Sequence, residues 1–574
     1  MRIALGQCSS AGRKAINQDF HGALHPTGPT LHAKGVVVAQ ADGISSSTVS
    51  REAAETAVKG FLEDYYATPE NWSVKRSGQR VINAINCWLH AQTRKGPNRF
   101  DRNKGYVCTF SALVIKSRTA HLFHLGDSRV CHLHGERLEP LTEEHRVRLD
   151  DGKSYLTRAL GISDRLEIDY SAYSVEPGTV LVMMTDGVHE FVDDATIAQT
   201  IREQPDELDG AAARIVKQAL ANGSDDNLTI QIVRVLDLPD SEPNLLSPGA
   251  DHQPLPPRFH PGDQVDGYEV IRPIHVNARS NLYLAIDIEK GDRVVIKCPS
   301  VDTRESPDHI ERLLVEEWVA RRLDHPCLLK APSQRQPRSY LYALSCYIEG
   351  QTLQQWMHDN PEPELEQVRD IVEQIASGLR AMHRQEILHQ DLRPANIMID
   401  THGRVCIIDF GAVAIAGVSE LETRPPAPIL GTAPYTAPEY FLGLSGSPRS
   451  DLFSLGVITY QMLCGKLPYG TAVAKTKTRR ALYRLKYQPL SRQGVRFPDW
   501  IDGALRKAVQ PDPEKRHEAL SEFVHDLRHP NPAYATERKI PLLERNPLRF
   551  WKVLSLTLFL AVLALLVTHP ALRS

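Results

Sequence analysis

Short, β-rich hydrophobic runs separated by Gly and Asp recur through the first part of the chain. They lie at 35–43, 109–115, 179–187 and 227–233. Two longer stretches, at about 47–66 and 76–95, carry apolar residues at helical spacing. Buried strands that alternate with packed helices predict an α+β domain.

A proline-rich segment ends this pattern. Seven prolines fall between Pro239 and Pro261, in sequence that is poor in β-branched residues. Such sequence cannot bury enough surface to order itself, so we interpret it as a linker. Beyond it, short strands to about residue 350 precede a region of helical periodicity. The pattern predicts a first domain at 1–236, a linker at 237–265 and a second domain at 266–530.

The end of the chain is strongly apolar. Residues 550–568 are long enough to cross a hydrocarbon core as a helix, and a basic segment, 531–549, precedes them. Basic residues dominate the side that precedes this stretch, which by the positive-inside rule places the two domains in the cytoplasm. We therefore predict one C-terminal transmembrane helix in a single-pass membrane protein. A buried core helix or an oligomer helix is the alternative.

The composition excludes several classes of protein. The chain has 574 residues, 42% of them hydrophobic, and a formal net charge of −3. These values do not fit a mostly disordered chain, and near-neutrality argues against a nucleic-acid partner. Nine cysteines without a CxxC pair indicate neither a disulfide framework nor a zinc ribbon, and favour a reducing compartment.

Carboxylates follow several of the predicted strands of the first domain. Asp42, Asp186 and Asp226 each come at the end of an apolar run, and Asp19 is a fourth candidate. Carboxylate oxygens are ligands that Mg²⁺ and Mn²⁺ prefer. Two such ions can activate a water and hold a phosphoryl group. Any single Asp-Gly can equally be a turn.

The order of these residues is more specific than any one of them. The motifs are Arg13 to Asp19, Ala41-Asp-Gly43, Gly126-Asp-Ser-Arg129, Leu141-Thr-Glu-Glu-His145, Leu156 to Gly161, Thr185-Asp-Gly-Val-His-Glu190 and Asp226-Asn-Leu-Thr229. This series resembles the metal-dependent type 2C (PPM) protein serine/threonine phosphatases. The resemblance implies a four-layer α/β-sandwich with two Mn²⁺ or Mg²⁺ ions and phosphoprotein substrates.

The resemblance also implies a role for each residue. Asp42 would bridge both metal ions, and the carbonyl of Gly43 would bind one of them. Asp186 and Asp226 would hold the other ion. Arg13 would bind the substrate phosphate, as a planar bidentate donor can.

Two further carboxylates complete the implied site, and two motifs depart from the family pattern. Asp19 would fix metal-bound water, and Asp127 is an additional metal-associated carboxylate. The usual Asp-Gly-x-Gly-Gly appears as Asp42-Gly-Ile-Ser-Ser46, and Gln18 stands where a Glu often lies. These changes could alter the loop shape or the affinity for the second metal. Water attacks phosphorus directly in this mechanism, so no nucleophilic Cys or Ser is implied.

Protein kinase signatures appear in order in the second domain. They are Val294-Val-Ile-Lys297, Glu316, Cys346 to Gly350, His389 to Asn396, Asp409-Phe-Gly411, Ala437-Pro-Glu439, Asp451 and Arg516. The series resembles bacterial eukaryotic-like serine/threonine kinases and implies a bilobal kinase fold that binds ATP with Mg²⁺. Lys297 would contact the nucleotide phosphates and pair with Glu316, for which the adjacent Glu317 is the alternative.

The remaining kinase roles follow from the same resemblance. Asp391 would orient the substrate hydroxyl and accept its proton. Asn396 and Asp409 would bind Mg²⁺. Arg516 would pair with Glu439.

Three departures leave the activity of this domain open. Residues 275–280 replace the glycine-rich loop that normally approaches the phosphates. Gln390 replaces the arginine of His-Arg-Asp, and Arg393 replaces the usual lysine. The leading hypothesis is a bifunctional kinase and phosphatase. The alternative is an active phosphatase that a nucleotide-binding pseudokinase domain regulates.

The kinase domain is itself a candidate substrate of the phosphatase. Covalent linkage gives the two domains a high effective concentration if the linker reaches. Ser419, Thr423 and Thr432 of the activation segment are the candidate sites.

Overall fold

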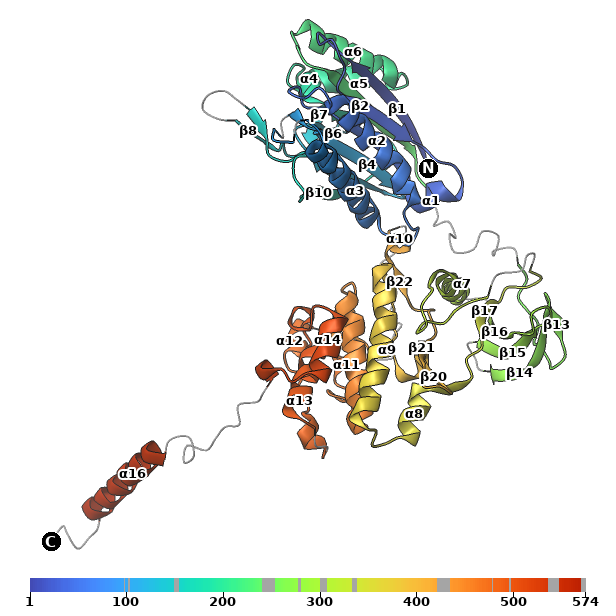
Figure 1. Ribbon diagram of the computed structural model, residues 1–574, viewed down its shortest axis with the longest axis vertical. Coiled ribbons are helices and arrows are strands. Elements are labelled where there is room, and N and C mark those ends of the chain that lie inside the picture. Colours follow the sequence, from blue (N-terminus) through green and yellow to red (C-terminus); the bar gives the residue numbers. More distant parts are fainter. Residues whose placement is uncertain are drawn as a thin grey trace. The chain divides into compact units, whose positions relative to one another are not determined.

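The computed structural model describes most of the chain (Figure 1). The described residues are 1–97, 99–101, 104–148, 154–239, 253–276, 280–299, 307–332, 338–420, 434–476, 478–494, 497–534 and 547–568. By their internal contacts they form two compact units. The first comprises Met1–Ile348, Leu379–Gln390 and Ile408–Leu430, and the second comprises Glu349–Gly378, Asp391–Ile407 and Gly431–Ser574.

Two five-stranded antiparallel sheets build the first domain. One has the order β1 (Arg2–Ser10), β12 (Leu228–Asp237), β11 (Val180–Met184), β6 (Arg129–His134) and β7 (Arg137–Pro140). The other has the order β10 (Asp169–Ser174), β5 (Thr119–Leu125), β4 (Phe110–Lys116), β3 (Val36–Ala41) and β2 (Phe20–Leu24). A hairpin joins β8 (Arg146–Arg148) to β9 (Ser154–Leu156).

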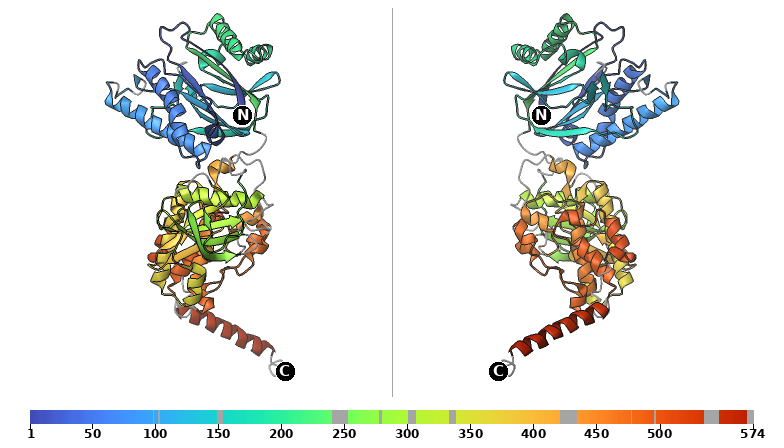
Figure 2. Two further views of the ribbon diagram at one scale, coloured as in Figure 1. Left: turned by 90° about the vertical axis from the view of Figure 1, so that its right-hand side faces the viewer. Right: turned by 90° about the vertical axis from the view of Figure 1, so that its left-hand side faces the viewer.

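Helices cover both outer faces of these sheets (Figure 2). They are α1 (Pro29–Lys34), α2 (Ser50–Ala67), α3 (Val74–Lys95), α4 (Asp186–His189), α5 (Asp194–Glu203) and α6 (Leu208–Ala221). One apolar cluster lies between α2, α3 and the second sheet, and another lies between α5, α6 and the first sheet. A third cluster lies between the two sheets. Three cores separate four layers, so the predicted four-layer sandwich is confirmed.

The strands of β3 and β4 show why the sheets fold as they do. Every residue of both strands is buried. A strand that is buried on both faces needs a near-continuous apolar run rather than an alternating one, and Val36–Ala41 is such a run except at Gln40.

A five-stranded antiparallel sheet opens the second predicted domain. Its order is β13 (Gln264–Val265), β14 (Tyr268–Val276), β15 (Ser280–Asp287), β16 (Arg293–Pro299) and β17 (Ala343–Cys346). Helix α7 (Pro307–Arg322) packs on β16 and β17. The first unit also contains the pair β19 (Ile387–Leu388) and β22 (Ala414–Ile415) and the short helix α10 (Ala416–Ser419).

The second unit is mainly helical. Its elements are β18 (Gly350–Thr352), α8 (Leu353–Asp359), η4 (Pro394–Asn396), β20 (Ile397–Asp400), β21 (Val405–Ile407), η5 (Pro438–Leu442), α11 (Pro448–Cys464), η6 (Val473–Lys475), α12 (Arg479–Leu482), η7 (Leu490–Gln493), α13 (Asp499–Ala508), η8 (Pro513–Lys515), α14 (Leu520–Arg528), η9 (Pro532–Tyr534) and α16 (Pro547–Thr568). Helix α9 (Leu365–Arg384) begins in this unit and ends in the first. Helix α11 is apolar around its whole circumference and is buried along nearly all of its length.

The C-terminal prediction needs a correction. The structure has a helix at the predicted place, α16. Within the described part of the chain, however, no helix combines the length and the hydrophobicity that crossing a membrane requires. The predicted transmembrane helix therefore receives no support from the structure. Residues 240–252 of the predicted linker and 535–546 of the predicted basic segment lie outside the described residues.

Candidate active sites

Three aspartates of the first domain converge where strands end. Asp42 follows β3, Asp127 follows β5, and Asp186 follows β11 and opens α4. A carboxylate oxygen from each lies within 4.8 Å of one from each of the others. The two sheets thus bring residues from distant parts of the sequence to one point, as the candidate metal site requires.

Burial makes negative charge unfavourable in this cluster. Burial raises the pKa of Asp42 well above its ordinary range, and the nearby carboxyls of Asp19, Asp186 and Asp127 raise it further. Burial, followed by the charge of Asp186, raises the pKa of Asp127 to about 7, although Arg146 opposes the shift. Carboxyl groups that repel one another in this way are stabilised by a bound cation.

Asp19 lies beside the cluster and is held by two hydroxyl groups. Its Oδ2 accepts hydrogen bonds from Thr185 Oγ1 at 3.1 Å and from Thr229 Oγ1 at 2.7 Å. Burial raises the pKa of Asp19 to about 6, and the two hydroxyls oppose that rise. A carboxylate that is fixed at one oxygen can present the other oxygen to a water.

Asp226, the fourth predicted ligand, pairs with a lysine. Lys14 Nζ contacts Asp226 Oδ1 and donates to Ser45 Oγ at 2.7 Å. Asn227 holds the loop that carries this lysine, since its Nδ2 donates to the carbonyls of Ala11 and Ile16 at 3.0 Å. The resemblance implies that a metal ion compensates the charge of Asp226. In the structure, the ammonium group of Lys14 compensates it.

Arg13, on the same loop, is exposed. Its guanidinium donates to the carbonyl of Leu220 at 3.5 Å. The structure brings neighbouring Lys14, rather than Arg13, onto a predicted metal ligand. The phosphate-binding role of Arg13 stays a prediction.

Gly43 and Gly187 pack so closely against neighbouring backbone that a side chain would not fit at either position. A Cβ on Gly43 would lie 2.7 Å from the carbonyl oxygen of Ser50, and one on Gly187 would lie 2.0 Å from that of Asn227. Close backbone packing therefore fixes the loops that carry Asp42 and Asp186.

Arg146 is a site residue that sequence reasoning missed. Its guanidinium lies 2.5 Å from Asp127 Oδ2, 2.9 Å from Asp186 Oδ2 and 3.0 Å from Glu190 Oε1. In the sequence, the one indication of its role was its position directly after the motif that ends at His145. An arginine between acidic groups stabilises them without neutralising the whole cluster.

The residues present fit a divalent metal centre. The donors are carboxylate oxygens, which hard cations prefer. Asp186 Oδ1 is buried without a hydrogen-bond partner among the described residues. An unpartnered buried carboxylate oxygen beside two further carboxylates is suited to coordinate a cation.

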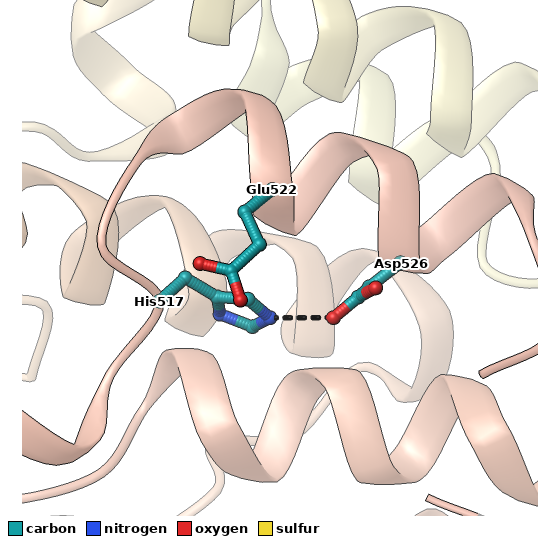
Figure 3. Close-up of side chains that lie close together, drawn as sticks. All are labelled: His517, Glu522 and Asp526. Atoms are coloured by element: carbon teal, nitrogen blue, oxygen red, sulfur yellow. Dashed lines mark hydrogen bonds and ion pairs between the residues drawn. The ribbon is translucent and has the colours of Figure 1, made fainter. Parts of the chain in front are cut away.

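A second acidic cluster lies in the kinase domain and has partners within the chain (Figure 3). It consists of His517, Glu522 and Asp526. His517 Nε2 lies 3.1 Å from Asp526 Oδ2, and Lys507 lies 2.5 Å from Glu522. Lys507 supplies the positive charge, so we interpret this cluster as a structural network.

In the first unit, the kinase lysine has the partner that the signatures predict. Lys297 Nζ lies 2.5 Å from Glu316 Oε2 and 3.6 Å from Asp409 Oδ1. Burial alone would lower the pKa of Lys297, but Glu316 and Asp409 raise it. The adjacent Glu317 instead pairs with Arg321 and, at 2.5 Å, with Arg338. Of the two candidate glutamates, Glu316 therefore pairs with Lys297.

In the second unit, the catalytic-loop residues contact one another. Asn396 Nδ2 donates to the carbonyl of Asp391 at 2.9 Å and lies 3.3 Å from its Oδ2. Arg393, which departs from the usual lysine, lies 3.7 Å from Asp391 Oδ2 and 3.3 Å from Asn396 Oδ1. The replacement keeps a cation beside Asp391.

The predicted pair of Arg516 and Glu439 is confirmed. Two bonds of 2.7 Å join the guanidinium to both carboxylate oxygens, and both side chains are buried. Of the residues that replace the glycine-rich loop, 277–279 lie outside the described part of the chain.

Two family profiles match the chain. "Protein phosphatase 2C" matches residues 8–222, and "Protein kinase domain" matches residues 268–528. Serine/threonine-protein kinase PrkC of Bacillus subtilis (strain 168) is 28% identical over 271 residues, 46% of this chain and 41% of PrkC. Serine/threonine-protein kinase PknB of Mycobacterium leprae (strain TN) is 29% identical over 273 residues, 46% of this chain and 42% of PknB. The chain thus spans less than half the length of these relatives.

Solved structures resemble each domain separately. The Mycobacterium tuberculosis PknI kinase domain is 24% identical, with a TM-score of 0.36, and the match covers 47% of this chain and 99% of that one. The S. agalactiae serine/threonine phosphatase is 22% identical, with a TM-score of 0.36, and the match covers 41% of this chain and 100% of that one. The two family matches lie on the two regions whose sites are described above. The chain therefore joins a protein phosphatase 2C domain to a serine/threonine protein kinase domain.

Proposed function

We propose that this chain is a bifunctional signalling enzyme. Its first domain would hydrolyse phosphoserine and phosphothreonine in proteins, and its second would transfer the γ-phosphoryl group of ATP to Ser or Thr. The observation that carries the proposal is that one chain has both the carboxylate cluster around Asp42 and the Lys297–Glu316 pair.

In the phosphatase reaction, two Mn²⁺ or Mg²⁺ ions, when bound, would supply an activated water and positive charge. Asp42, Asp127 and Asp186 would hold them. Asp19, fixed by Thr185 and Thr229, would orient a water through its other oxygen.

Cationic groups at the same site would bind the substrate. Arg13 is the candidate for the substrate phosphate, because a guanidinium can bind two phosphate oxygens at once. Lys14 lies on the same loop, at Asp226, and adds positive charge there.

In the kinase reaction, ATP with Mg²⁺ would supply the phosphoryl group. Lys297, held by Glu316, would bind phosphate oxygens, and Asp409 and Asn396 are the candidate Mg²⁺ ligands. Asp391 would accept the proton of the substrate hydroxyl. Arg393 places a cation beside Asp391, 3.7 Å from its Oδ2.

A second candidate function is an active phosphatase that a nucleotide-binding pseudokinase domain regulates. The observation that favours it is the sequence at 275–280, which lacks the loop glycines. Side chains there would hinder the close approach of backbone N–H groups to phosphates.

One experiment separates these candidates. The intact chain with Asp42→Ala would be incubated with γ-labelled ATP, so that its own phosphatase cannot remove the label. If the chain becomes labelled and the additional change Asp409→Ala abolishes the labelling, the domain is a kinase. If the chain binds the nucleotide but no phosphoryl group is transferred, the domain is a pseudokinase. Hydrolysis of a phosphothreonine peptide by wild type but not by Asp42→Ala tests the phosphatase half.

The kinase domain is a candidate substrate of the phosphatase. Ser419 is exposed, whereas Thr423 and Thr432 lie outside the described residues. Phosphosite mapping of Asp42→Ala with ATP should reveal more phosphate on the activation segment than on that of the wild type. Equal occupancy would contradict the idea.

The location of the chain is a separate proposal. The sequence-based expectation is a membrane attachment with both domains in the cytoplasm. Fractionation of cells that express the full chain, with and without residues 550–568, would test it.

A further inference from the structure

The first turn of α3 and the end of β4 form an anion-binding surface on the phosphatase domain. The surface consists of Asn71, Ser73, Val74 and Lys116. It lies outside the carboxylate cluster, and its partners in the structure belong to the kinase domain. These partners are the loop that follows α9 and the segment that follows Asp409-Phe-Gly411, both within the first compact unit.

Two glutamates bind the free N–H groups at the start of α3. Ser73 N donates to Glu386 Oε2 at 2.7 Å, and Ser73 Oγ lies 2.9 Å from the same oxygen. Val74 N donates to Glu420 Oε1 at 3.0 Å. The first N–H groups of a long helix lack partners within the helix and carry partial positive charge, so carboxylates stabilise them.

Lys116 adds a buried cation to the same surface. Its side chain is 1% exposed, and its Nζ donates to the carbonyl of Gly417 at 2.6 Å and lies 3.1 Å from Glu420 Oε2. A lysine is almost never fully buried unless it is paired, and the pairing groups here come from the kinase domain. Burial lowers the pKa of Lys116, and Glu420 opposes that shift.

The backbone at Gly417 fits this surface closely. Gly417 N donates to the carbonyl of Asn71 at 3.1 Å. A Cβ on Gly417 would lie 2.4 Å from the carbonyl oxygen of Glu70 and 2.8 Å from that of Trp72. A residue with a side chain could not occupy this position without displacing the backbone of the phosphatase domain.

We propose that this surface is a docking site through which the phosphatase domain holds the start of the kinase activation segment, at Gly417 and Glu420. Docking immobilises α10, which ends at the candidate phosphorylation site Ser419 and precedes Thr423 and Thr432 in the sequence. The phosphatase domain therefore restrains a segment that protein kinases rearrange when their activity changes. The docking requires neither kinase activity nor phosphatase activity, so this proposal does not depend on the proposed function.

Hydrogen–deuterium exchange of the intact chain tests the proposal. Gly417→Ala changes a kinase residue only, yet we expect peptides that contain Ser73 and Val74 to exchange about tenfold faster or more, because their N–H groups lose carboxylate partners. Glu420→Gln should accelerate the exchange of Val74, and Lys116→Met should accelerate that of residues 414–420.

The matched control is Lys59→Met, a lysine on the exposed face of α2 that pairs with Glu55. It should leave exchange at both places unchanged. Exchange in β11 and β12, in the other sheet of the domain, reports whether each variant is folded. If Gly417→Ala and Glu420→Gln leave the Ser73 and Val74 peptides at the wild-type rate, the docking site does not exist in solution.

Discussion

The negative charges of buried acidic groups are compensated differently in the two domains. In the phosphatase domain, Asp127 and Asp186 share the guanidinium of Arg146, and neighbouring carboxyls raise the pKa of Asp42. In the kinase domain, Glu316 has Lys297 and Glu439 has Arg516. The first site needs cations from solution to become favourable, whereas the second carries its own. The same kind of residue therefore depends on external cations in one domain and on the chain's own cations in the other.

Asp42→Asn should have the largest effect on activity. Removal of the central carboxylate should lower phosphopeptide hydrolysis by about a thousandfold or more, because the ions that stabilise the developing charge lose their shared ligand. Steady-state hydrolysis in Mn²⁺ measures this. Asp225→Asn, on the residue before Asp226, is the matched control and should stay near the wild-type rate. Comparable hydrolysis by Asp42→Asn and the wild type would remove Asp42 from the metal site.

Lys297→Met should lower phosphoryl transfer by about a hundredfold or more, since a preorganised cation at the phosphates is lost. The assay is label transfer from ATP, and Lys290→Met, in the turn before β16, is the control. Phosphopeptide hydrolysis by Lys297→Met should match that of the wild type. A variant with unchanged transfer would show that Lys297 does not contact the nucleotide.

Two substitutions with opposite expected effects on the free energy of unfolding test this difference between the domains. Arg516→Met should lower the free energy of unfolding by about 3–5 kcal/mol, because Glu439 stays buried without its partner. Asp42→Asn without metal should raise it by about 1–2 kcal/mol, because it removes repulsion within the cluster. Denaturant unfolding in a metal chelator measures both. Two shifts of the same sign would contradict the contrast between the domains.

The pH dependence of stability should be the smallest effect. Burial, together with His145, lowers the pKa of His124 to about 4 from its ordinary 6.5. Between these values the unfolded chain binds a proton that the folded chain does not. The contribution of His124 to stability therefore falls as pH falls, by about 1–2 kcal/mol between pH 6.5 and pH 5, whereas the raised pKa of Asp127 contributes in the opposite direction.

The unfolding transition of the phosphatase domain is measured by denaturant titration at both pH values. His124→Asn removes the titrating ring, so the variant should lose less stability, or gain more, than the wild type between pH 6.5 and pH 5, whereas mutation of the exposed His25 should leave the dependence unchanged. An identical slope in His124→Asn would exclude this histidine as the cause.

The sequence predicted the sandwich and the kinase elements because their signals are local. Apolar runs such as Val36–Ala41 predict buried strands directly, and Asp42 and Asp186 could be placed at strand ends from the same pattern. The sequence favoured Glu316 over Glu317 as the partner of Lys297, but both lie on one helix, so packing was needed to decide which of them faces the lysine. Arg146 was missed because the partners that give it meaning, Asp127 and Asp186, are distant in sequence.

The docking surface was beyond sequence reasoning for the same reason. Lys116 ends an ordinary strand, and nothing near it in sequence indicates Glu420, more than 300 residues away. Only the three-dimensional arrangement reveals that this lysine has a partner for its charge.

The pairing of β1 with β12 has a consequence for synthesis on the ribosome. Arg2–Ser10, made first, pairs along its length with Leu228–Asp237, made last in the domain. The loop held by Asn227 likewise waits for that final strand. Contacts of such large sequence separation form slowly, and until they form the nascent chain has exposed strand edges. The phosphatase domain therefore reaches its native state only after its last strand has left the exit tunnel, when translation of the kinase domain is already under way.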